Sequence, residues 1–276
     1  MLSLLTAKNY VSSYYLSQTQ RARFQDVRAY CMFIGHMKSG GSMIGSLLDA
    51  HPNAILADEV DALRYVQAGF SREQIFHVLL RASRKELAKG RVTARRLGAY
   101  SWLVPGQWQG RYSTLQVIGE SATGISTLRL GQTPGLLSKL QTRMGGVNLK
   151  FIHVIRNPYD PISLMMVRGK RTFEAAFEHY FRSCEMLVDL RSRLDVSSLL
   201  AVRYEDFICQ PEEGLLSICR FLGLQAGADY LAACSGILRQ TPDRSRSLVQ
   251  WEPRWIEQVR ERMSTFGFLA GYSFEN

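Results

Sequence analysis

Runs of consecutive apolar residues recur along the chain and predict the strands of a buried sheet. A strand that is apolar on successive residues is expected where helices cover both faces of a parallel sheet. The segments between these runs show helical spacing of their apolar residues, so strands and helices alternate. This pattern predicts one α/β domain with a central parallel sheet flanked by helices. The predicted strands are residues 31–34, 53–57, 115–119, 150–155 and 199–203.

The spacing of polar and apolar positions also places the helices. One helix is expected after Ser42, a candidate N-cap, and another opens with the acidic residues 58–61 and runs to about residue 68. Residues 90–114 show no single period and predict loops and short strands that cover a pocket. Longer amphipathic helices are predicted at residues 71–89 and 172–193 and from about residue 253.

The length of 276 residues and the hydrophobic content of 46% suffice for one domain with a core. No linker rich in Pro, Gly or Ser divides the chain, so we expect a polar lead-in with one helix at residues 1–27 and one domain at residues 28–276. The N-terminal stretch lacks the basic start, long apolar core and cleavage site of a secretory signal. No apolar run reaches the length of a membrane span, and we expect no membrane partner.

The net charge of +10 favours an anionic partner, which includes nucleic acid, an acidic membrane surface or a highly charged small ligand. The densest basic tract, residues 81–96, also contains acidic and apolar residues and is interpreted as a solvated helix face followed by a loop. The five cysteines are scattered, odd in number and free of C-x-x-C pairs. This cysteine usage predicts a reducing cytoplasm and no structural zinc.

The stretch after the first predicted strand suits an anion. Gly35, Gly40 and Gly41 allow a sharp turn and a close approach of the backbone to a ligand. The helix that follows directs its unpaired N–H groups and the positive end of its dipole at one point, which favours phosphate. Lys38 adds a cation. A glycine-rich turn without a ligand is the alternative for this stretch alone.

The same stretch is close to the Walker A pattern G-x-x-x-x-G-K-[ST], since Gly35, Gly40 and Ser42 fit it. Gly41, however, occupies the position of the lysine. A nucleotide triphosphatase without that lysine loses its main contact to the transferred phosphate. Ordinary kinase or ATPase chemistry is therefore disfavoured.

The run K-S-G-G-S at residues 38–42 resembles the K-S-G-T-T loop of sulfotransferases that use 3′-phosphoadenosine 5′-phosphosulfate (PAPS). The run L-L-D-A-H-P at residues 47–52 is also similar to that family. The resemblance implies the P-loop-like sulfotransferase fold, PAPS as donor, the desulfated nucleotide PAP as product, and no metal. It also implies which loop residues bind the 5′-phosphosulfate end, namely Lys38, Ser39, Gly40, Gly41, Ser42 and Met43.

A second signature, R-N-P-Y-D-P-I-S, follows the predicted strand at residues 150–155. A guanidinium at the end of a strand can hold phosphate through two N–H groups. The segment resembles the R-N-P-x-D motif that binds the 3′-phosphate of the donor, which implies this role for Arg156 and Ser163. The family's serine lies eight residues after the arginine and Ser163 lies seven after it, a rotation of about 100° on a helix.

Two later segments add to the similarity. In the run R-Y-E-D-F the family places the tyrosine beside the adenine, which implies that role for Tyr204. A cap or a salt bridge is the alternative role for Glu205 and Asp206. A polar loop before the last helix lies where the family closes over the nucleotide. Arg244 and Arg246 are therefore candidate contacts to the 3′-phosphate, and a surface charge run is the alternative.

Acidic residues after the strands supply the candidate base. The resemblance implies that Glu59 is the general base, and helix capping is the alternative. Related sulfotransferases often carry a lysine, or a lysine and a histidine, where this chain has Ser121. That difference weakens catalysis, leaves Lys38 to act alone, or gives a role to Glu120, which is the reserve candidate for the base.

Together these features predict in-line transfer of a sulfuryl group from PAPS to a hydroxyl, or to an amine or guanidine nitrogen, of a small-molecule acceptor. Asp58, Glu59 and Asp61 favour a cationic acceptor such as an alkaloid-like natural product. A P-loop nucleotide kinase and a non-catalytic nucleotide- or RNA-binding protein are the alternatives. Nucleic acid is not the expected partner, and the sequence does not predict the oligomeric state.

Overall fold

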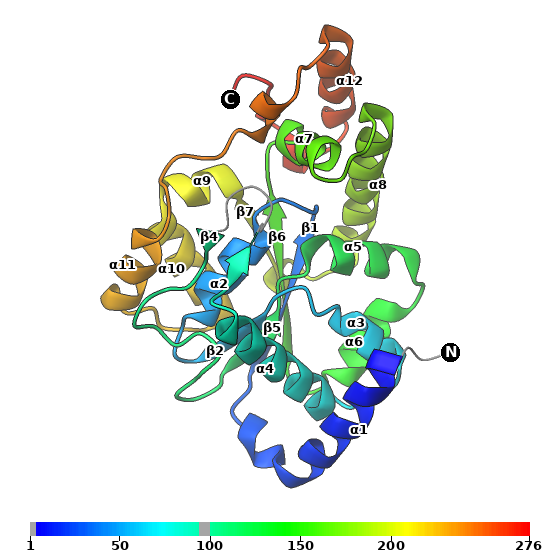
Figure 1. Ribbon diagram of the computed structural model, residues 1–276. Coiled ribbons are helices and arrows are strands. Elements are labelled where there is room, and N and C mark those ends of the chain that lie inside the picture. Colours follow the sequence, from blue (N-terminus) through cyan, green and yellow to red (C-terminus); the bar gives the residue numbers. More distant parts are fainter. Residues whose placement is uncertain (1–3, 94–99) are drawn as a thin grey trace.

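The computed structural model describes residues 4–93 and 100–276 (Figure 1). At its centre is a five-stranded sheet with the order β2-β5-β1-β6-β7, in which all neighbouring strands are parallel. The expectation of a central parallel sheet is confirmed. The strands of this sheet are β1 (Ala29–Gly35), β2 (Ala54–Ala57), β5 (Val117–Glu120), β6 (Asn148–Ile155) and β7 (Leu199–Arg203).

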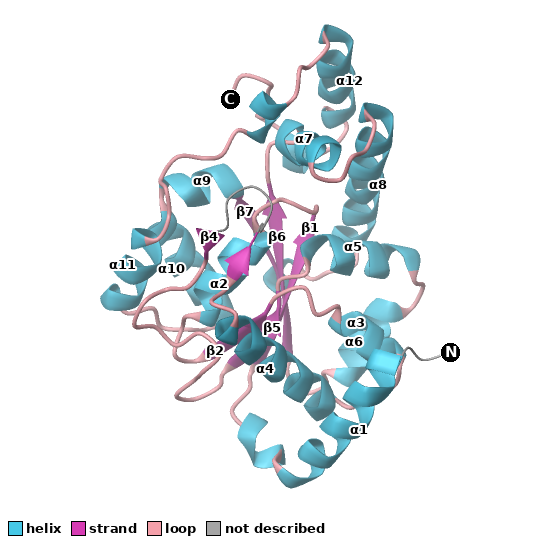
Figure 2. Ribbon diagram, in the orientation of Figure 1, coloured by secondary structure: helices cyan, strands magenta, loops and turns pink. Residues whose placement is uncertain are grey.

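Helices cover both faces of the sheet (Figure 2). The central strand β1 is buried throughout, and its side chains alternate between two cores: Tyr30 and Met32 belong to one, Cys31 and Phe33 to the other. The first core is lined by α3 (Ala62–Gln67), α4 (Arg72–Ala88), α5 (Thr123–Gln132), α6 (Leu136–Arg143) and α8 (Phe173–Ser192). The second core is lined by α2 (Gly41–Asp49), α9 (Tyr204–Cys209), α10 (Pro211–Leu222) and α11 (Ala228–Gly236).

A third apolar cluster lies beyond the end of β6, at the top of Figure 1. It packs α7 (Tyr159–Val167) and α8 against α12 (Pro253–Met263). The Tyr159 hydroxyl donates to the carbonyl of Ile256 at 3.0 Å and so links α7 to α12. The loop before α12, which includes the 3₁₀ turn η3 (Ser245–Leu248), is thereby held next to α7.

The helix expected in residues 1–27 is α1 (Leu4–Thr19), and the 3₁₀ turn η1 (Arg21–Phe24) follows it. α1 lies against α4, and Asn9 Nδ2 donates to the Tyr65 hydroxyl at 2.5 Å. The lead-in segment therefore packs on the domain. Among the described residues, no helix has both the length and the apolar character needed to cross a bilayer.

Two helix starts differ from the expectation. The N-cap of α2 is Gly40 with φ of 103°, so Ser42 lies inside the first turn and is not the cap. α3 begins at Ala62, and the acidic residues that were expected in its first turn form a loop before it. The backbone explains this shift, because Glu59 and Asp61 have φ of 47° and 59°, outside the right-handed helical region.

The segment between α4 and β5 is irregular, as expected. The preceding helix α4 starts after Ser71, whose side chain forms a capping box with Gln74, which confirms the helix predicted at residues 71–89. A short antiparallel pair follows, β3 (Val92–Thr93) and β4 (Tyr100–Ser101). Residues 94–99, which belong to the predicted loop at 90–114 and partly to the basic tract at 81–96, lie outside the described residues.

Candidate active site

The carboxyl ends of the five parallel strands meet at one edge of the sheet. Open α/β sheets bind ligands at this edge, where the chain changes direction across the sheet, here on either side of β1. Five of the sequence-predicted residues lie at or just after strand ends. They are Lys38 after β1, Glu59 after β2, Glu120 at the end of β5, Arg156 after β6 and Tyr204 after β7.

The loop between β1 and α2 takes its shape from left-handed backbone. Gly35, Lys38 and Gly40 have φ of 136°, 68° and 103°, which turn the chain sharply before α2 begins. Gly40 lies against Tyr204, since a Cβ added at Gly40 would be 2.5 Å from a carbon of the ring. Residues that stand far apart in the sequence therefore form one wall. The first turn of α2 holds the remaining predicted loop residues, Gly41, Ser42 and Met43.

Close packing against Thr123 leaves no space for a side chain at Gly41. A Cβ added at Gly41 would lie 2.5 Å from Thr123 Cγ2. The Thr123 hydroxyl donates to the carbonyl of His36 at 3.2 Å, and the Ser39 hydroxyl donates to the same carbonyl at 2.8 Å. These contacts fix the loop backbone and fill the place that a Walker lysine would need.

Arg156 joins the second motif to this loop. Its Nη1 donates to the carbonyl of Lys38 at 3.0 Å, and its guanidinium lies 4.5 Å from the centre of the Tyr204 ring. Its Nη2 donates to Ser245 Oγ at 3.3 Å. The side chain is 5% exposed, and within the described chain its Nε makes no hydrogen bond, with Asp160 at 3.8 Å. A buried, incompletely paired guanidinium beside a helix N-terminus suits an anion.

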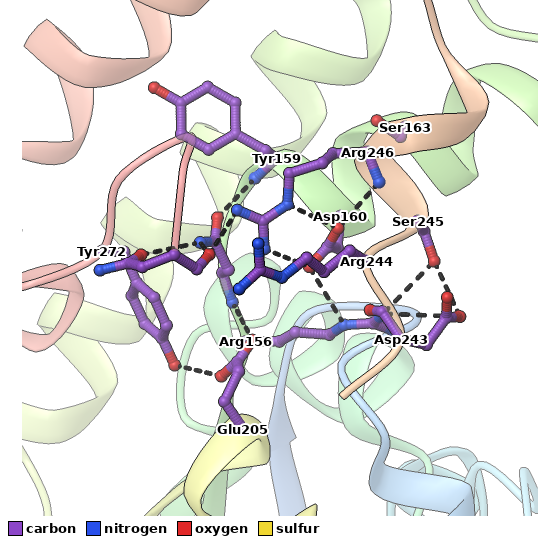
Figure 3. A network of polar contacts seen from close by, with 12 residues as sticks. Arg156, Tyr159, Asp160, Ser163, Glu205, Asp243, Arg244, Ser245, Arg246 and Tyr272 are labelled. Atoms are coloured by element: carbon purple, nitrogen blue, oxygen red, sulfur yellow. Dashed lines mark hydrogen bonds and ion pairs between the residues drawn. The ribbon is translucent and has the colours of Figure 1, made fainter. Parts of the chain in front are cut away.

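The polar loop before α12 closes over Arg156 (Figure 3). Arg246 is 6% exposed and pairs with Asp160 at 3.0 Å. It also donates to backbone carbonyls of residues 273–276. Arg244 is exposed and donates to another carbonyl of that segment at 2.8 Å. The structure therefore brings the predicted loop to Arg156, with both of its arginines engaged by the C-terminal segment.

Ser163 lies in the interior of the protein. It is fully buried on α7, and its hydroxyl accepts a hydrogen bond from Trp251 Nε1 at 3.1 Å. Its hydroxyl is thus committed to the loop before α12. Its role at the 3′-phosphate stays a prediction.

Glu59 is on the loop between β2 and α3, exposed to solvent. Partial desolvation and the neighbouring Asp58 raise the pKa of the Glu59 carboxyl, and Lys38 opposes this shift. Lys38 is thus near enough to Glu59 for its charge to act on the carboxyl group. Asp58 is oriented by Ser121, whose hydroxyl donates to Asp58 Oδ1 at 2.9 Å. Asp61 is committed elsewhere, because its carboxylate pairs with Arg129.

Glu120 differs from Glu59 in its access to solvent. It is fully buried, and its carboxylate accepts the N–H of Ala62 at 2.9 and 3.0 Å, so it caps the N-terminus of α3. Burial raises the pKa of Glu120 to about 8. Its contacts are those of a carboxyl group that supports α3.

His36, on the same loop as Lys38, is a further titratable group near the site. Its ring stacks on Tyr180 with centres 3.9 Å apart, and its Nε2 lies 3.1 Å from the Tyr180 carbonyl. Burial lowers the pKa of His36 to about 3, so the ring stays neutral. His36 packs in the interior against Tyr180 of α8 and so supports the loop between β1 and α2.

Two further carboxylates support the site. Asp160 accepts two hydrogen bonds from the Arg246 side chain and one from its backbone N–H. Glu205 accepts the N–H of Asn157 at 2.9 Å and the Tyr272 hydroxyl at 2.7 Å, and it therefore braces the start of α7. The only sequence signal for Asp160 is its place in the R-N-P-x-D run, which gives no hint of its partner.

Comparison with known proteins bears on the fold and on one segment of the chain. Residues 148–228 match the model described as "Sulfotransferase family", and this range contains β6, Arg156, Ser163, β7 and Tyr204. Among solved structures, the chain is similar to the sulfotransferase domain from the curacin biosynthetic pathway, with a TM-score of 0.56, 14% identity, and coverage of 87% of this chain and 98% of that chain. The chain thus has the fold of these proteins, and its residues 148–228 are similar to the sulfotransferase family.

Two further sulfotransferases share the fold. Sulfotransferase STF9 from Mycobacterium avium has a TM-score of 0.51 and 11% identity, with 92% of this chain and 81% of that chain covered. Sulfotransferase STF1 from Mycobacterium tuberculosis H37Rv has a TM-score of 0.50 and 12% identity, with the same coverage of 92% and 81%. No curated protein matches the sequence. The segment that matches the family model does not include the loop at residues 38–43.

Proposed function

We propose that this protein is a sulfotransferase that moves a sulfuryl group from PAPS to a hydroxyl, or to an amine or guanidine nitrogen, of a small-molecule acceptor. The observation that carries the proposal is the contact between the two predicted phosphate motifs. Arg156 binds the carbonyl of Lys38 and stacks on Tyr204, which in turn covers Gly40. One bisphosphorylated adenosine can therefore meet both motifs.

The donor supplies an activated sulfuryl group on its 5′-phosphate. Lys38 and the N–H groups at the start of α2 would hold this end and stabilise the negative charge that develops on the bridging oxygen. Arg156, whose Nε makes no hydrogen bond within the described chain, and Ser245 would hold the 3′-phosphate. Tyr204 would pack near the adenine. Binding of the 3′-phosphate would also involve Arg244, Arg246 and Ser163. These residues would either contact the phosphate after release from their present partners or hold the loop before α12 in place.

Glu59 is the proposed general base. It would take the proton from the acceptor as the new S–O or S–N bond forms and the bond between sulfur and the bridging oxygen of the 5′-phosphate breaks. Its exposure gives an acceptor access, and its raised pKa improves its strength as a base. Glu120 lacks this access because it is fully buried.

A cationic acceptor, such as an alkaloid-like natural product, is the finer part of the proposal. Asp61 no longer supports it, because its charge is neutralised by Arg129. Asp58 and Glu59 remain, and Glu86 adds a further negative potential at Glu59. Competition between organic cations and neutral analogues of equal size in a turnover assay tests this part by itself.

A P-loop kinase is the main competing function. The place of its lysine is filled by Thr123, which argues against it. Calorimetric titration with PAP, ATP with magnesium, and a short RNA separates the three functions. We expect PAP to bind at least about fivefold more tightly than ATP, because a contacted 3′-phosphate contributes about 1–3 kcal/mol. Preference for ATP would support the kinase, and preference for RNA a binding protein.

The chemical step is tested by Glu59→Gln in an assay with PAPS and a broad panel of acceptors. Removal of a general base lowers turnover by about 10²–10⁴-fold. PAP affinity should be retained, because Glu59 lies on the acceptor side. Glu120→Gln is the matched control and should keep most of its turnover. The reverse result would make Glu120 the base.

A further inference from the structure

The two edges of the central sheet are protected to different degrees. At one edge β2 is buried along its whole length. At the other edge β7 has the sequence LLAVR, four of its residues are only partly buried, and Ala201 is exposed. An open edge with apolar residues, without the lysine, proline or bulge that usually guards one, favours pairing with another strand.

The outer side of β7 also has free backbone groups. β7 pairs with β6 on its inner side over its full length. Within the described chain, no backbone hydrogen bond from a segment other than β6 reaches residues 199–202. In a strand that is paired on one side, alternate N–H and C=O groups point outward and are available to a partner.

A groove of about 250 Å³ runs beside this edge, between β7 and α10. One wall is formed by β7 residues Leu200 to Arg203, and the outer wall is the face of α10 that carries Glu213 and Ser217. Residues seven apart on a helix share a face, so Arg220 continues this wall two turns further on. Glu213, Ser217 and Arg220 are all exposed. The wall therefore has an acidic end and a basic end, separated by about 10 Å.

We propose that a second copy of this chain occupies this edge, with the two β7 strands antiparallel across a two-fold axis near Ala201. The sequence LLAVR is suited to this pairing, because Ala201 would face its own copy and Leu200 would face Val202. The same axis sets the two α10 helices side by side and antiparallel, so that Glu213 of each copy meets Arg220 of the other. The two five-stranded sheets then form one continuous sheet.

The charge arrangement selects a second copy over an unrelated strand. A two-fold interface must be complementary to itself, so it needs opposite charges at equal distances from its axis. Glu213 and Arg220 lie on either side of Ser217 and meet this condition. The alternative explanation is that an acidic residue near the start of α10 and a basic residue near its end stabilise the helix through its dipole. Stabilisation of a helix within one chain does not depend on protein concentration, whereas dimer formation does.

The proposal is tested by measuring molar mass with light scattering over a range of protein concentrations at low salt. The wild-type chain should be a dimer. Glu213→Arg and Arg220→Glu each place like charges together twice in a homodimer, and each should raise the dissociation constant by about tenfold or more. Glu212→Arg changes the charge equally on the neighbouring face of α10, and this control should dimerise as the wild type does.

Mixing the two variants gives the decisive measurement. In a heterodimer of Glu213→Arg with Arg220→Glu both contacts are again of opposite charge, so the mixture should recover dimers at concentrations where each variant alone is monomeric. Unfolding temperatures show that both variants are folded. A monomeric wild type, single variants that dimerise as the wild type does, or a mixture that stays monomeric would each overturn the proposal.

Discussion

Two carboxylates at the same edge of the sheet have opposite environments, and burial decides their roles. Glu59 and Glu120 both follow strand ends, so their positions in the sequence do not distinguish them. Glu59 is exposed and is coupled to Asp58 and Lys38, whereas Glu120 is fully buried against the first N–H group of α3. A base must reach its acceptor, so the geometry favours Glu59.

The pH dependence of turnover should follow the charges around Glu59. A base acts when it is deprotonated, so kcat/KM should rise with pH through the pKa of Glu59. Asp58→Asn removes a negative neighbour that raises this pKa, so the rising limb should move to lower pH. The asparagine still accepts the Ser121 hydroxyl. Glu86→Gln should move the limb in the same direction by less, and an unmoved limb in both variants would show that another group titrates.

Glu120 should make the protein less stable as the pH rises. Burial raises its pKa from 4.5 to about 8, so the folded state favours the protonated carboxyl. Its contribution is complete below the pKa of the unfolded chain and is lost as the pH rises through the folded pKa, at up to about 1.4 kcal/mol per pH unit. Glu120→Gln should flatten this dependence. Urea unfolding between about pH 5 and pH 8 measures it, and parallel slopes for both proteins would contradict the assignment.

Single residues also show where prediction from the sequence stops. The motif identifies Arg156 because its position after a strand is a local feature. Ser163 and Arg246 depend on partners far along the chain, Trp251 and Asp160, which no local pattern reveals. The sequence therefore predicts which residues lie at the site. It does not predict which of their side chains are engaged in hydrogen bonds or ion pairs with other parts of the protein.

At the scale of elements, the junction of β1 and α2 depends on the absence of a side chain at Gly41. Gly41→Ala would place a methyl group 2.5 Å from Thr123 Cγ2 and should destabilise the protein by about 1–3 kcal/mol, the usual range for overpacking. PAP affinity should fall as well, because the N–H groups of α2 would shift. Chemical unfolding and calorimetry measure the two effects.

A second substitution separates this clash from other effects of the alanine. Thr123→Ser removes Cγ2 and retains the hydroxyl that binds the His36 carbonyl. The double variant Gly41→Ala with Thr123→Ser should recover much of the stability and PAP affinity, and Thr123→Ser alone serves as the control. A double variant no better than Gly41→Ala would place the cause elsewhere.

Element starts were harder to predict than element types. The strand at residues 199–203 follows from an apolar run and the helix at 71–89 from the helical spacing of its apolar residues, and both are local signals. The start of α3 does not, because Glu59 and Asp61 adopt left-handed backbone and the cap comes from Glu120, 58 residues away from Ala62. The acidic residues at 58–61 are compatible both with the first turn of a helix and with a loop before it.

At the scale of the whole molecule, the parallel sheet joins motifs that the sequence separates. Alternating strands and helices predict that strand ends share one edge, so a common site for residues 38–43 and 156 could be inferred before the structure. The open edge at β7 could not, because LLAVR has the apolar character of a fully covered strand. Exposure of Ala201 is a property of the assembled sheet.

Binding of one nucleotide should protect both halves of the site at once. PAP carries phosphates at both ends of its ribose, so hydrogen exchange should slow in the loop at residues 35–43 and in the loop at residues 241–248 together. ADP lacks the 3′-phosphate and should protect the first loop with little effect on the second. The free energy of the 3′-phosphate contacts, about 1–3 kcal/mol, corresponds to roughly a 5–150-fold difference in affinity.

Arg156→Lys provides the matched variant for this experiment. Lysine keeps the positive charge but loses the two-pronged contact and the stacking on Tyr204. Protection of the second loop by PAP should therefore approach that seen with ADP, while the first loop remains protected. If PAP slowed exchange in only one loop of the unaltered protein, the two motifs would serve different ligands and the donor assignment would fail.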